Sequence, residues 1–101
     1  FTFKHIASRV DARDIAAVLR VVDNDTLVTA LSGATDDLTK PSAEFILDNI
    51  SNRLADQLRE AIQERGEVNE DDAETAMSDV VAGVRQLAEN GEILLNEDIT
   101  A

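Results

Sequence analysis

Apolar residues recur along most of the chain at intervals of three and four residues, which is the spacing of one face of an α-helix. Residues 3–7 predict at most a short turn, and a first clear helix follows over about residues 12–22. Asp11, with Asp14 three residues later, resembles a capping arrangement at the start of this helix. Its predicted buried face consists of Ile15, Val18, Leu19 and Val22.

The next helix is predicted between an acidic or amide cap and a glycine. Asp23 or Asn24 supplies the cap, because short polar side chains accept hydrogen bonds from the free backbone N–H groups of a first turn. Gly33 ends the helix, since glycine favours the left-handed position that follows a helix. The predicted buried residues are Leu27, Val28 and Leu31.

Residues 35–48 are interrupted by the single proline of the chain. Pro41 cannot sit deep in a helix without the loss of a backbone hydrogen bond. We therefore expect Thr35 to cap a first turn that contains Leu38, and a break or kink near residues 39–42. A helix then continues through Phe45, Ile46 and Leu47.

Two longer helices complete the pattern. The first is capped by Ser51, runs to Arg65 and stops at Gly66, and the second is capped by Asn69 and stops at Gly91. The buried stripe of the first is Leu54, Leu58 and Ile62, with Ala55 and Ala61 beside it. The apolar set of the second is Ala73, Ala76, Met77, Val80, Val81, Val84, Leu87 and Ala88, after the first-turn acids Glu70, Asp71 and Asp72.

These elements predict an all-α fold, a compact bundle of five or six short helices that forms one domain over residues 1–95, followed by a disordered tail over residues 96–101. The hydrophobic content of 44% allows a small core, which must be built from aliphatic side chains because the chain has three Phe and no Trp or Tyr. The chain has no Cys, so disulfides and thiolate metal sites are excluded. Phe at position 1 leads us to expect a piece of a longer chain.

The formal net charge is −12, and it is unevenly distributed. Residues 1–35 carry four basic and four acidic side chains, so the whole excess lies in residues 36–101. Such a surface repels phosphate backbones and anionic lipid, which argues against nucleic-acid and membrane-surface binding. It would attract a basic protein partner. The alternative is that the acidic charge only keeps a small domain soluble, or reflects a salty habitat.

Candidate chemistry is sparse. The single His5 has no Cys and no serine-elbow motif to work with, and the four glycines form no phosphate-binding loop. The stretch VDNDTL at 22–27 begins like a calcium loop but places Leu27 at the next ligand position. The acid pairs Asp36–Asp37 and Asp71–Asp72 stand at predicted helix starts, where capping explains them. We therefore expect neither enzymatic activity nor a cofactor or metal ion.

The surface of the helix over residues 51–65 is more informative. Its polar side carries Arg53, Asp56, Gln57, Glu60 and Glu64. Arg53 and Asp56 form one pair at i, i+3. The three acids follow at steps of four residues, and each such like-charge pair destabilises an isolated helix by roughly 0.2–0.5 kcal/mol. From the pattern alone this row is either an ordinary solvated face or a charged surface for a partner.

The order of segments resembles the C-terminal domain family of the flagellar motor switch protein FliG, over nearly all of residues 1–95. The matching segments are Phe1-Thr2-Phe3, similar to the end of the family's Met-Phe-x-Phe hinge, DARDIAAVLRVVDNDTLVTALSGA at 11–34, NISNRLADQLRE at 49–60, RGEV at 65–68 and RQLAENGEI at 85–93. No single segment is decisive, but their order and nearly constant spacing make the joint match specific.

The resemblance implies a non-enzymatic helical domain at the rim of the cytoplasmic switch ring, peripheral to the inner membrane at the flagellar basal body. There it would meet the cytoplasmic loop of a MotA-type stator through its charged helix at 51–65 and generate torque for motility. It also implies contacts with other switch-ring proteins and a ring homo-oligomer in the full-length protein. The alternative is a FliG-like helical scaffold or adaptor domain in another membrane-associated assembly.

The family's charged positions carry over only in part. Its leading arginine matches Arg53, and its paired acids fall on Glu60 and Ala61. Its lysine falls on Ser32, and a later arginine falls on Asn69. The resemblance therefore makes Arg53 and Glu60 the principal stator-facing residues.

A rearranged charge pattern would use three further residues of the same helix. These are Asp56, Glu64 and Arg65. The segment KPSA at 40–43 looks like a four-residue insertion ahead of the charged helix.

Overall fold

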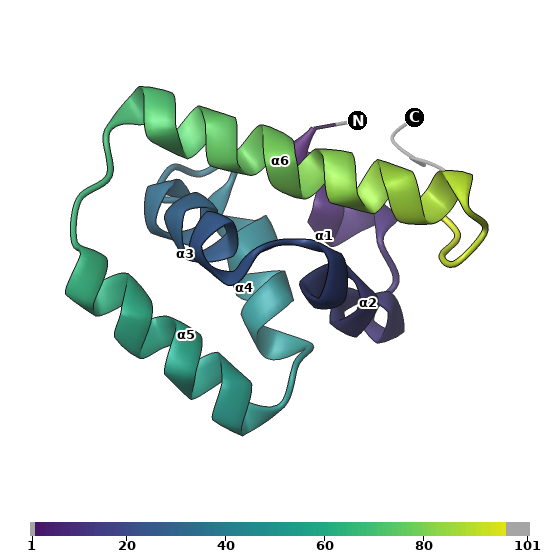
Figure 1. Ribbon diagram of the computed structural model, residues 1–101, viewed down its shortest axis with the longest axis horizontal. Helices are drawn as coiled ribbons and strands as arrows, with labels where there is room; N and C mark the ends of the chain where they lie inside the picture. Colours follow the sequence, from purple (N-terminus) through teal and green to yellow (C-terminus); the bar gives the residue numbers. More distant parts are fainter. Residues whose placement is uncertain (1, 97–101) are drawn as a thin grey trace.

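Helices make up almost all of the regular structure in the computed structural model, which describes residues 2–96 (Figure 1). In chain order they are the 3-10 helix η1 (Phe3–His5), α1 (Ile6–Arg9), the 3-10 helix η2 (Ala12–Asp14), α2 (Ile15–Val21), α3 (Asn24–Gly33), α4 (Lys40–Asp48), α5 (Asn52–Arg65) and α6 (Glu70–Glu89). One isolated antiparallel bridge joins Val10 to Leu95. The predicted all-α bundle of five or six helices is confirmed.

The long helix α6 organises the core. It runs across the whole domain in Figure 1 and packs most extensively on α3, with further contacts to α2 and η1. The periodic apolar positions predicted for it face inward, because residues three and four apart lie on one side of a helix. The fully buried ones are Ala73, Ala76, Val80, Val84 and Leu87, and the partly buried ones are Met77, Val81 and Ala88.

Glycine allows α3 and α6 to approach closely. A Cβ atom added at Gly33 would lie 2.4 Å from the Cβ of Ala73 on α6, too close for any side chain. Gly33 is the last residue of α3 and has no positive φ, so the prediction that it occupies a left-handed position after the helix is wrong. The left-handed glycines are Gly66 and Gly91, with φ values of 69° and 73°, at the two helix ends predicted for them.

Three predicted helix caps are confirmed. The Asp23 carboxylate accepts a hydrogen bond from the Thr26 N–H. The Ser51 hydroxyl accepts from the Leu54 N–H at 3.2 Å. The Asn69 side chain accepts from the N–H of Asp72 at 2.8 Å and so begins α6.

Two other predicted caps are wrong, and other interactions replace them. The Asp11 side chain makes no capping bond within the described residues. It accepts a hydrogen bond from the Asn96 amide at 2.8 Å, which joins it to the last described residue. At the next site Asp36, not Thr35, closes the turn, because its Oδ1 accepts from the N–H groups of Leu38 and Thr39 at 3.0 and 2.8 Å.

The N-terminal segment is more structured than its sequence predicts. Instead of a single short turn, residues 3–9 form η1 and α1, and both Phe3 and Ile6 are buried in the core. Their burial depends on α4 and α6, which pack against η1 and are distant in sequence. A short run of apolar residues does not reveal such contacts by itself.

The KPSA segment becomes the first turn of α4. Pro41 lies in this first turn, where its missing N–H costs nothing. The break predicted near residues 39–42 is therefore misplaced: the helix is continuous from Lys40, and the interruption lies at residues 34–39. Ser42 and Ala43 are buried, and the Ser42 hydroxyl accepts a hydrogen bond from the Ala7 N–H at 3.3 Å. The apparent insertion therefore packs α4 against α1.

The last described residue is held in place. The Asn96 N–H donates to the Arg9 carbonyl at 2.7 Å, and Arg9 Nε donates back to the Asn96 carbonyl at 2.8 Å. The remainder of the predicted tail, residues 97–101, lies outside the described residues.

Candidate functional site: the outer face of α5

Helix α5 lies at the periphery of the bundle, at the lower left of Figure 1, and packs mainly on α3 and less on α4. Only Ala55 and Leu58 are fully buried on it. Leu54 and Ile62, predicted in the same buried stripe, are partly buried, as is Ala61. The helix is therefore held by a narrow apolar strip, and most of its circumference meets solvent.

The outer face of α5 carries the charged row that the sequence predicts. Arg53, Asp56, Glu60 and Glu64 are all exposed, and their spacing of three and four residues places them along one side of the helix. Within residues 2–96 no salt bridge joins Arg53 to Asp56, and none reaches Glu60 or Glu64. The row therefore presents one cation followed by three carboxylates that no charge within the described domain neutralises.

Arg65 lies on a different side of α5. It stands seven residues, or about two turns, after the buried Leu58 and so faces the bundle. Its guanidinium donates from Nη1 to the Thr29 hydroxyl and from Nη2 to the Asp25 carboxylate, both on α3. Its side chain is 33% exposed. The sequence prediction grouped Arg65 with the outer row, but its donors already have acceptors inside the domain.

Arg59 is the other cation of α5 with a partner. Its guanidinium lies 3.9 Å from the Asp48 carboxylate at the end of α4, and both side chains are more than half exposed. Such solvent-exposed pairs contribute at most about 1 kcal/mol. This contact adds little to the attachment of α5.

The three neutral positions of the charge pattern have distinct surroundings. Asn69 caps α6, and its amide also donates to the Asp72 carboxylate at 3.0 Å, a role that an arginine could not fill. Ala61 is partly buried and lines a hollow of about 340 Å³ beside Asp25 and Glu64. Ser32 is partly buried, and its hydroxyl oxygen has no hydrogen-bond partner within the described residues.

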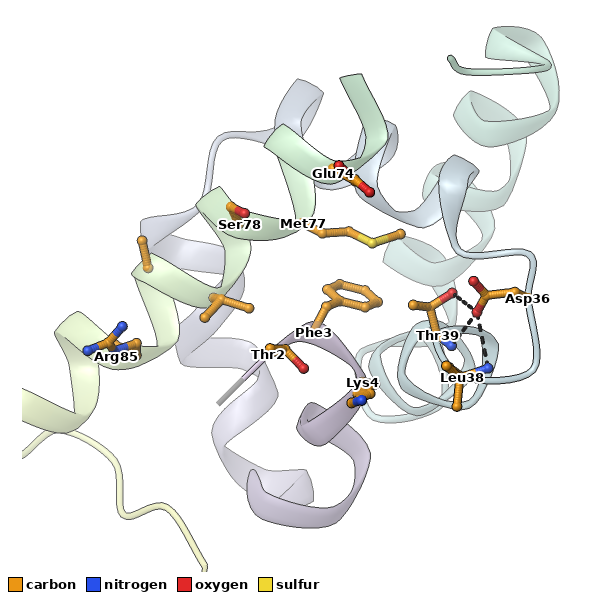
Figure 2. A pocket seen from close by; sticks show the side chains of 12 residues that line it. Thr2, Phe3, Lys4, Asp36, Leu38, Thr39, Glu74, Met77, Ser78 and Arg85 are labelled. Atoms are coloured by element: carbon orange, nitrogen blue, oxygen red, sulfur yellow. Dashed lines mark hydrogen bonds between the residues drawn. The ribbon is translucent and has the colours of Figure 1, made fainter. Parts of the chain in front are cut away.

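A larger hollow of about 610 Å³ lies between η1, the 36–39 turn and α6 (Figure 2). Phe3 and Met77 point into it, and the exposed Leu38 lies at its edge. Lys4 and Arg85 lie on its rim along with Asp36 and Glu74, so the lining carries two charges of each sign. This balanced, largely apolar lining contrasts with the acidic surface of α5.

The carboxylate of Asp36 has a structural role at this hollow. Hydrogen bonds from the Thr39 side chain and backbone, together with the Leu38 N–H, hold the pKa of Asp36 below its usual value of 3.8 (Figure 2). An exposed carboxylate that stays ionised at neutral pH is a poor general acid. Because the folded-state pKa is depressed, its stabilising contribution is present above about pH 3.8 and is lost as the pH falls through the folded value.

The other polar residues considered for chemistry also have partners. His5 Nδ1 accepts a hydrogen bond from the Thr2 N–H at 3.0 Å. In the stretch that begins like a calcium loop, Asp23 caps α3 and Asp25 binds Arg65. Within residues 2–96 no three His, Asp or Glu side chains are placed to hold a metal ion. In the same range no helix is both long and apolar enough to cross a membrane.

Comparison with known proteins shows that the chain is similar in sequence to flagellar motor switch proteins. Residues 1–95 match the family described as the FliG C-terminal domain. The flagellar motor switch protein FliG of Pseudomonas aeruginosa is 36% identical over 95 residues, which are 94% of this chain and 27% of that protein. The Thermotoga maritima FliG is 38% identical over the same coverage. This chain thus spans about a quarter of the length of these relatives.

Solved structures of FliG share the fold. A FliG fragment from H. pylori superposes with a TM-score of 0.81 at 33% identity, and the match covers 92% of this chain and 39% of that one. Full-length FliG from Aquifex aeolicus gives a TM-score of 0.77 at 34% identity, covering 96% of this chain and 28% of that one. These matches confirm the helical architecture that the sequence predicts.

Proposed function

This chain belongs to the FliG C-terminal domain family, and we propose that it is a non-enzymatic rotor component of a flagellar motor switch. In this role the outer face of α5 contacts the cytoplasmic loop of the stator and transmits torque. The stator-facing residues are Arg53, Asp56, Glu60 and Glu64. The full-length protein forms a ring with other copies and other switch proteins, in the cytoplasm at the inner membrane.

The observation that carries this proposal is the unpaired charge row of α5. All four side chains are exposed, and none has a salt-bridge partner within residues 2–96, although α5 is otherwise attached to α3 and α4. Three carboxylates in line weaken the helix by a few tenths of a kcal/mol per pair, so helix stability does not explain them. A basic partner segment would relieve this repulsion when it binds.

The energetics of exposed charges suit a repeated, transient contact. Each solvent-exposed ion pair contributes about 0.2–1 kcal/mol, so a few of them orient a partner without binding it tightly. Complementary charge also raises the association rate, which falls as salt screens it. A rotor that meets successive stators benefits from fast association and rapid release.

The proposal is tested by charge reversal in the full-length protein. The variant Arg53→Glu/Glu60→Lys keeps the net charge but reverses the first and third charges of the row. Because both side chains are exposed and unpaired, the fold should stay intact while swimming is lost or strongly reduced. Swimming speed on single cells and the thermal unfolding midpoint of the purified protein are the two measurements.

A matched control tests whether charge reversal elsewhere on the surface has the same effect as charge reversal on α5. The variant Arg20→Glu/Glu89→Lys makes the same two reversals on exposed residues of α2 and α6. It should leave swimming near the unmodified level. Normal swimming in the α5 variant, or equal loss in both variants, would contradict the proposal.

A second candidate function rests on the neutral positions. Ser32, Ala61 and Asn69 replace charged family positions, and the cap formed by Asn69 is integral to α6. A FliG-like scaffold or adaptor in another membrane-associated assembly would keep the fold without the stator pairing. Deletion of the gene decides between them: the rotor function requires loss of swimming, whereas an adaptor in another assembly leaves it unchanged.

A further inference from the structure

The C-terminal end of α5 is attached to α3 through one side chain. The guanidinium of Arg65 reaches two acceptors on successive turns of α3, the Asp25 carboxylate and the Thr29 hydroxyl. The planar fork of an arginine can bind two acceptors at once, whereas a lysine ammonium acts as a point charge. The contact therefore fixes both the distance and the direction between the two helices at this end.

The hydroxyl of Thr29 is oriented to accept a hydrogen bond from Arg65. The residue is almost fully buried, at 8% exposure, and among residues 2–96 the other buried polar residue is Ser42. Its hydroxyl donates to the Asp25 carbonyl at 2.9 Å, so its oxygen is left to accept from Arg65. A buried hydroxyl that loses its donor partner is costly, and this gives the contact more weight than the exposed Asp25 alone would supply.

Little else holds this half of α5. The two fully buried side chains of the helix, Ala55 and Leu58, lie in its first and middle turns. Beyond them Ala61 and Ile62 are only partly buried, and α5 stops at Gly66, where the chain turns with a φ of 69°. Residues 66–69 then lead to α6 without regular structure. The last two turns of α5, which carry Glu60 and Glu64, are therefore held mainly by these two partly buried side chains and by Arg65.

We propose that Arg65 is a positioning residue that clamps the C-terminal half of α5 onto α3 and so fixes the direction in which Glu60 and Glu64 face a partner. Arg65 acts through the helix and does not touch the partner itself. The consequence for the rotor rests on the proposed function, whereas the clamp is a property of the fold and can be measured separately.

The clamp predicts coupled behaviour of two residues on different helices. In the full-length protein, Arg65→Ala and Asp25→Asn should each speed amide hydrogen exchange in residues 59–65. The expected increase for Arg65→Ala is about three- to tenfold, the effect of losing hydrogen bonds to a charged group at a partly exposed site. Exchange in the core turns of α6 should not change. The double variant should be no faster than Arg65→Ala alone, because the two residues share one interaction.

Conservative and control variants sharpen this test. Arg65→Lys, which keeps the charge but loses the fork, should restore only part of the protection. Arg53→Ala removes an arginine of the outer row and should leave exchange in residues 59–65 unchanged. Unchanged exchange in Arg65→Ala, or an additive effect in the double variant, would overturn the clamp.

Swimming of the same variants then tests the positioning role. If Arg65 acts through α5, Arg65→Ala and Asp25→Asn should both reduce swimming, although Asp25 lies on α3. If Arg65 instead contacts the stator directly, Asp25→Asn swims normally and the positioning role is overturned. Coupled exchange with normal swimming in every variant, including Arg53→Glu/Glu60→Lys, would support the clamp and contradict the proposed function.

Discussion

Helices α5 and α6 have similar amphipathic patterns in the sequence but different positions in the fold. Five of the 20 residues of α6 are fully buried, along its whole length, and it crosses α3 at the close contact between Gly33 and Ala73. Only two of the 14 residues of α5 are fully buried, and one side of it is a row of charges that have no salt-bridge partner within residues 2–96. Helix α6 therefore stabilises the domain, whereas α5 is exposed on its surface, where a partner can reach it.

This difference follows from what each helix contacts. Small side chains at the crossing let α6 pack closely on α3, which gains dispersion contacts along the interface. At its C-terminal end α5 instead contacts α3 through Arg65. This polar contact leaves the outer side of α5 exposed to solvent. A partner can therefore reach α5 without disturbing the core.

The largest contrast is expected from truncation of one buried leucine on each helix. Leu87 on α6 and Leu58 on α5 are both 2% exposed. Leu87→Ala should lower the free energy of unfolding by an amount near the upper end of the usual range of about 2–5 kcal/mol, because α6 packs on α2, α3 and η1 and is less free to shift into the cavity. Leu58→Ala should fall near the lower end, because α5 can shift inward. Urea denaturation measures the free energy of unfolding of both variants, and equal losses would contradict the predicted difference between α6 and α5.

A smaller effect is expected at the helix crossing. Gly33→Ala should destabilise the domain by about 1–3 kcal/mol through overpacking against Ala73, although alanine is the better helix former. The double variant Gly33→Ala/Ala73→Gly moves the methyl group from one helix to the other and should recover much of this loss. Thermal unfolding of the three variants measures it, and a stable Gly33→Ala single variant would show that the crossing is not tight.

The helix caps should show the same contrast at about 1 kcal/mol. Asn69→Ala should lower the free energy of unfolding by about 1 kcal/mol, since Asn69 accepts from the Asp72 N–H at 2.8 Å and also donates to the Asp72 carboxylate at 3.0 Å. Ser51→Ala should cost about half as much, because Ser51 makes a single capping hydrogen bond, to the Leu54 N–H, and this bond is longer, at 3.2 Å. A larger loss for Ser51→Ala in chemical denaturation would reverse the predicted order.

The smallest stability change is expected in the charge row. Glu60→Lys places a cation between Asp56 and Glu64, and should raise the free energy of unfolding by a few tenths of a kcal/mol. The same change should weaken swimming, because it removes the carboxylate at the centre of the proposed contact. Glu89→Lys on α6 is the control, and a more stable variant that swims normally would indicate that the row is only a solvated face.

The sequence predicts the helices well because their signals are local. Caps such as Ser51 and Asn69 act within their own first turns, and Gly66 and Gly91 occupy the left-handed conformation that ends a helix. The repeating apolar positions of α6 likewise report its own buried face. The exposure of the charge row on α5 follows from the same periodicity.

The predictions that failed depend on distant contacts. Gly33 has no side chain because Ala73 on α6, 40 residues later in the chain, packs directly against it. Asp11 binds Asn96 instead of capping its own helix. Nothing near Phe3 shows that α4 and α6 will cover it. The inward direction of Arg65 was accessible, because it stands two turns from Leu58, but its acceptors on α3 were not.

The central claim is that the outer face of α5 meets the stator, and site-specific cross-linking tests it most directly. The chain contains no Cys, so single cysteines can be placed at Asp56 or Glu60 on α5 and at Glu89 on α6. With a cysteine in the stator's cytoplasmic loop, Asp56→Cys and Glu60→Cys should form cross-linked products in motor-bearing cells, and Glu89→Cys should not. Cross-linking from Glu89→Cys with none from either α5 position would contradict the account.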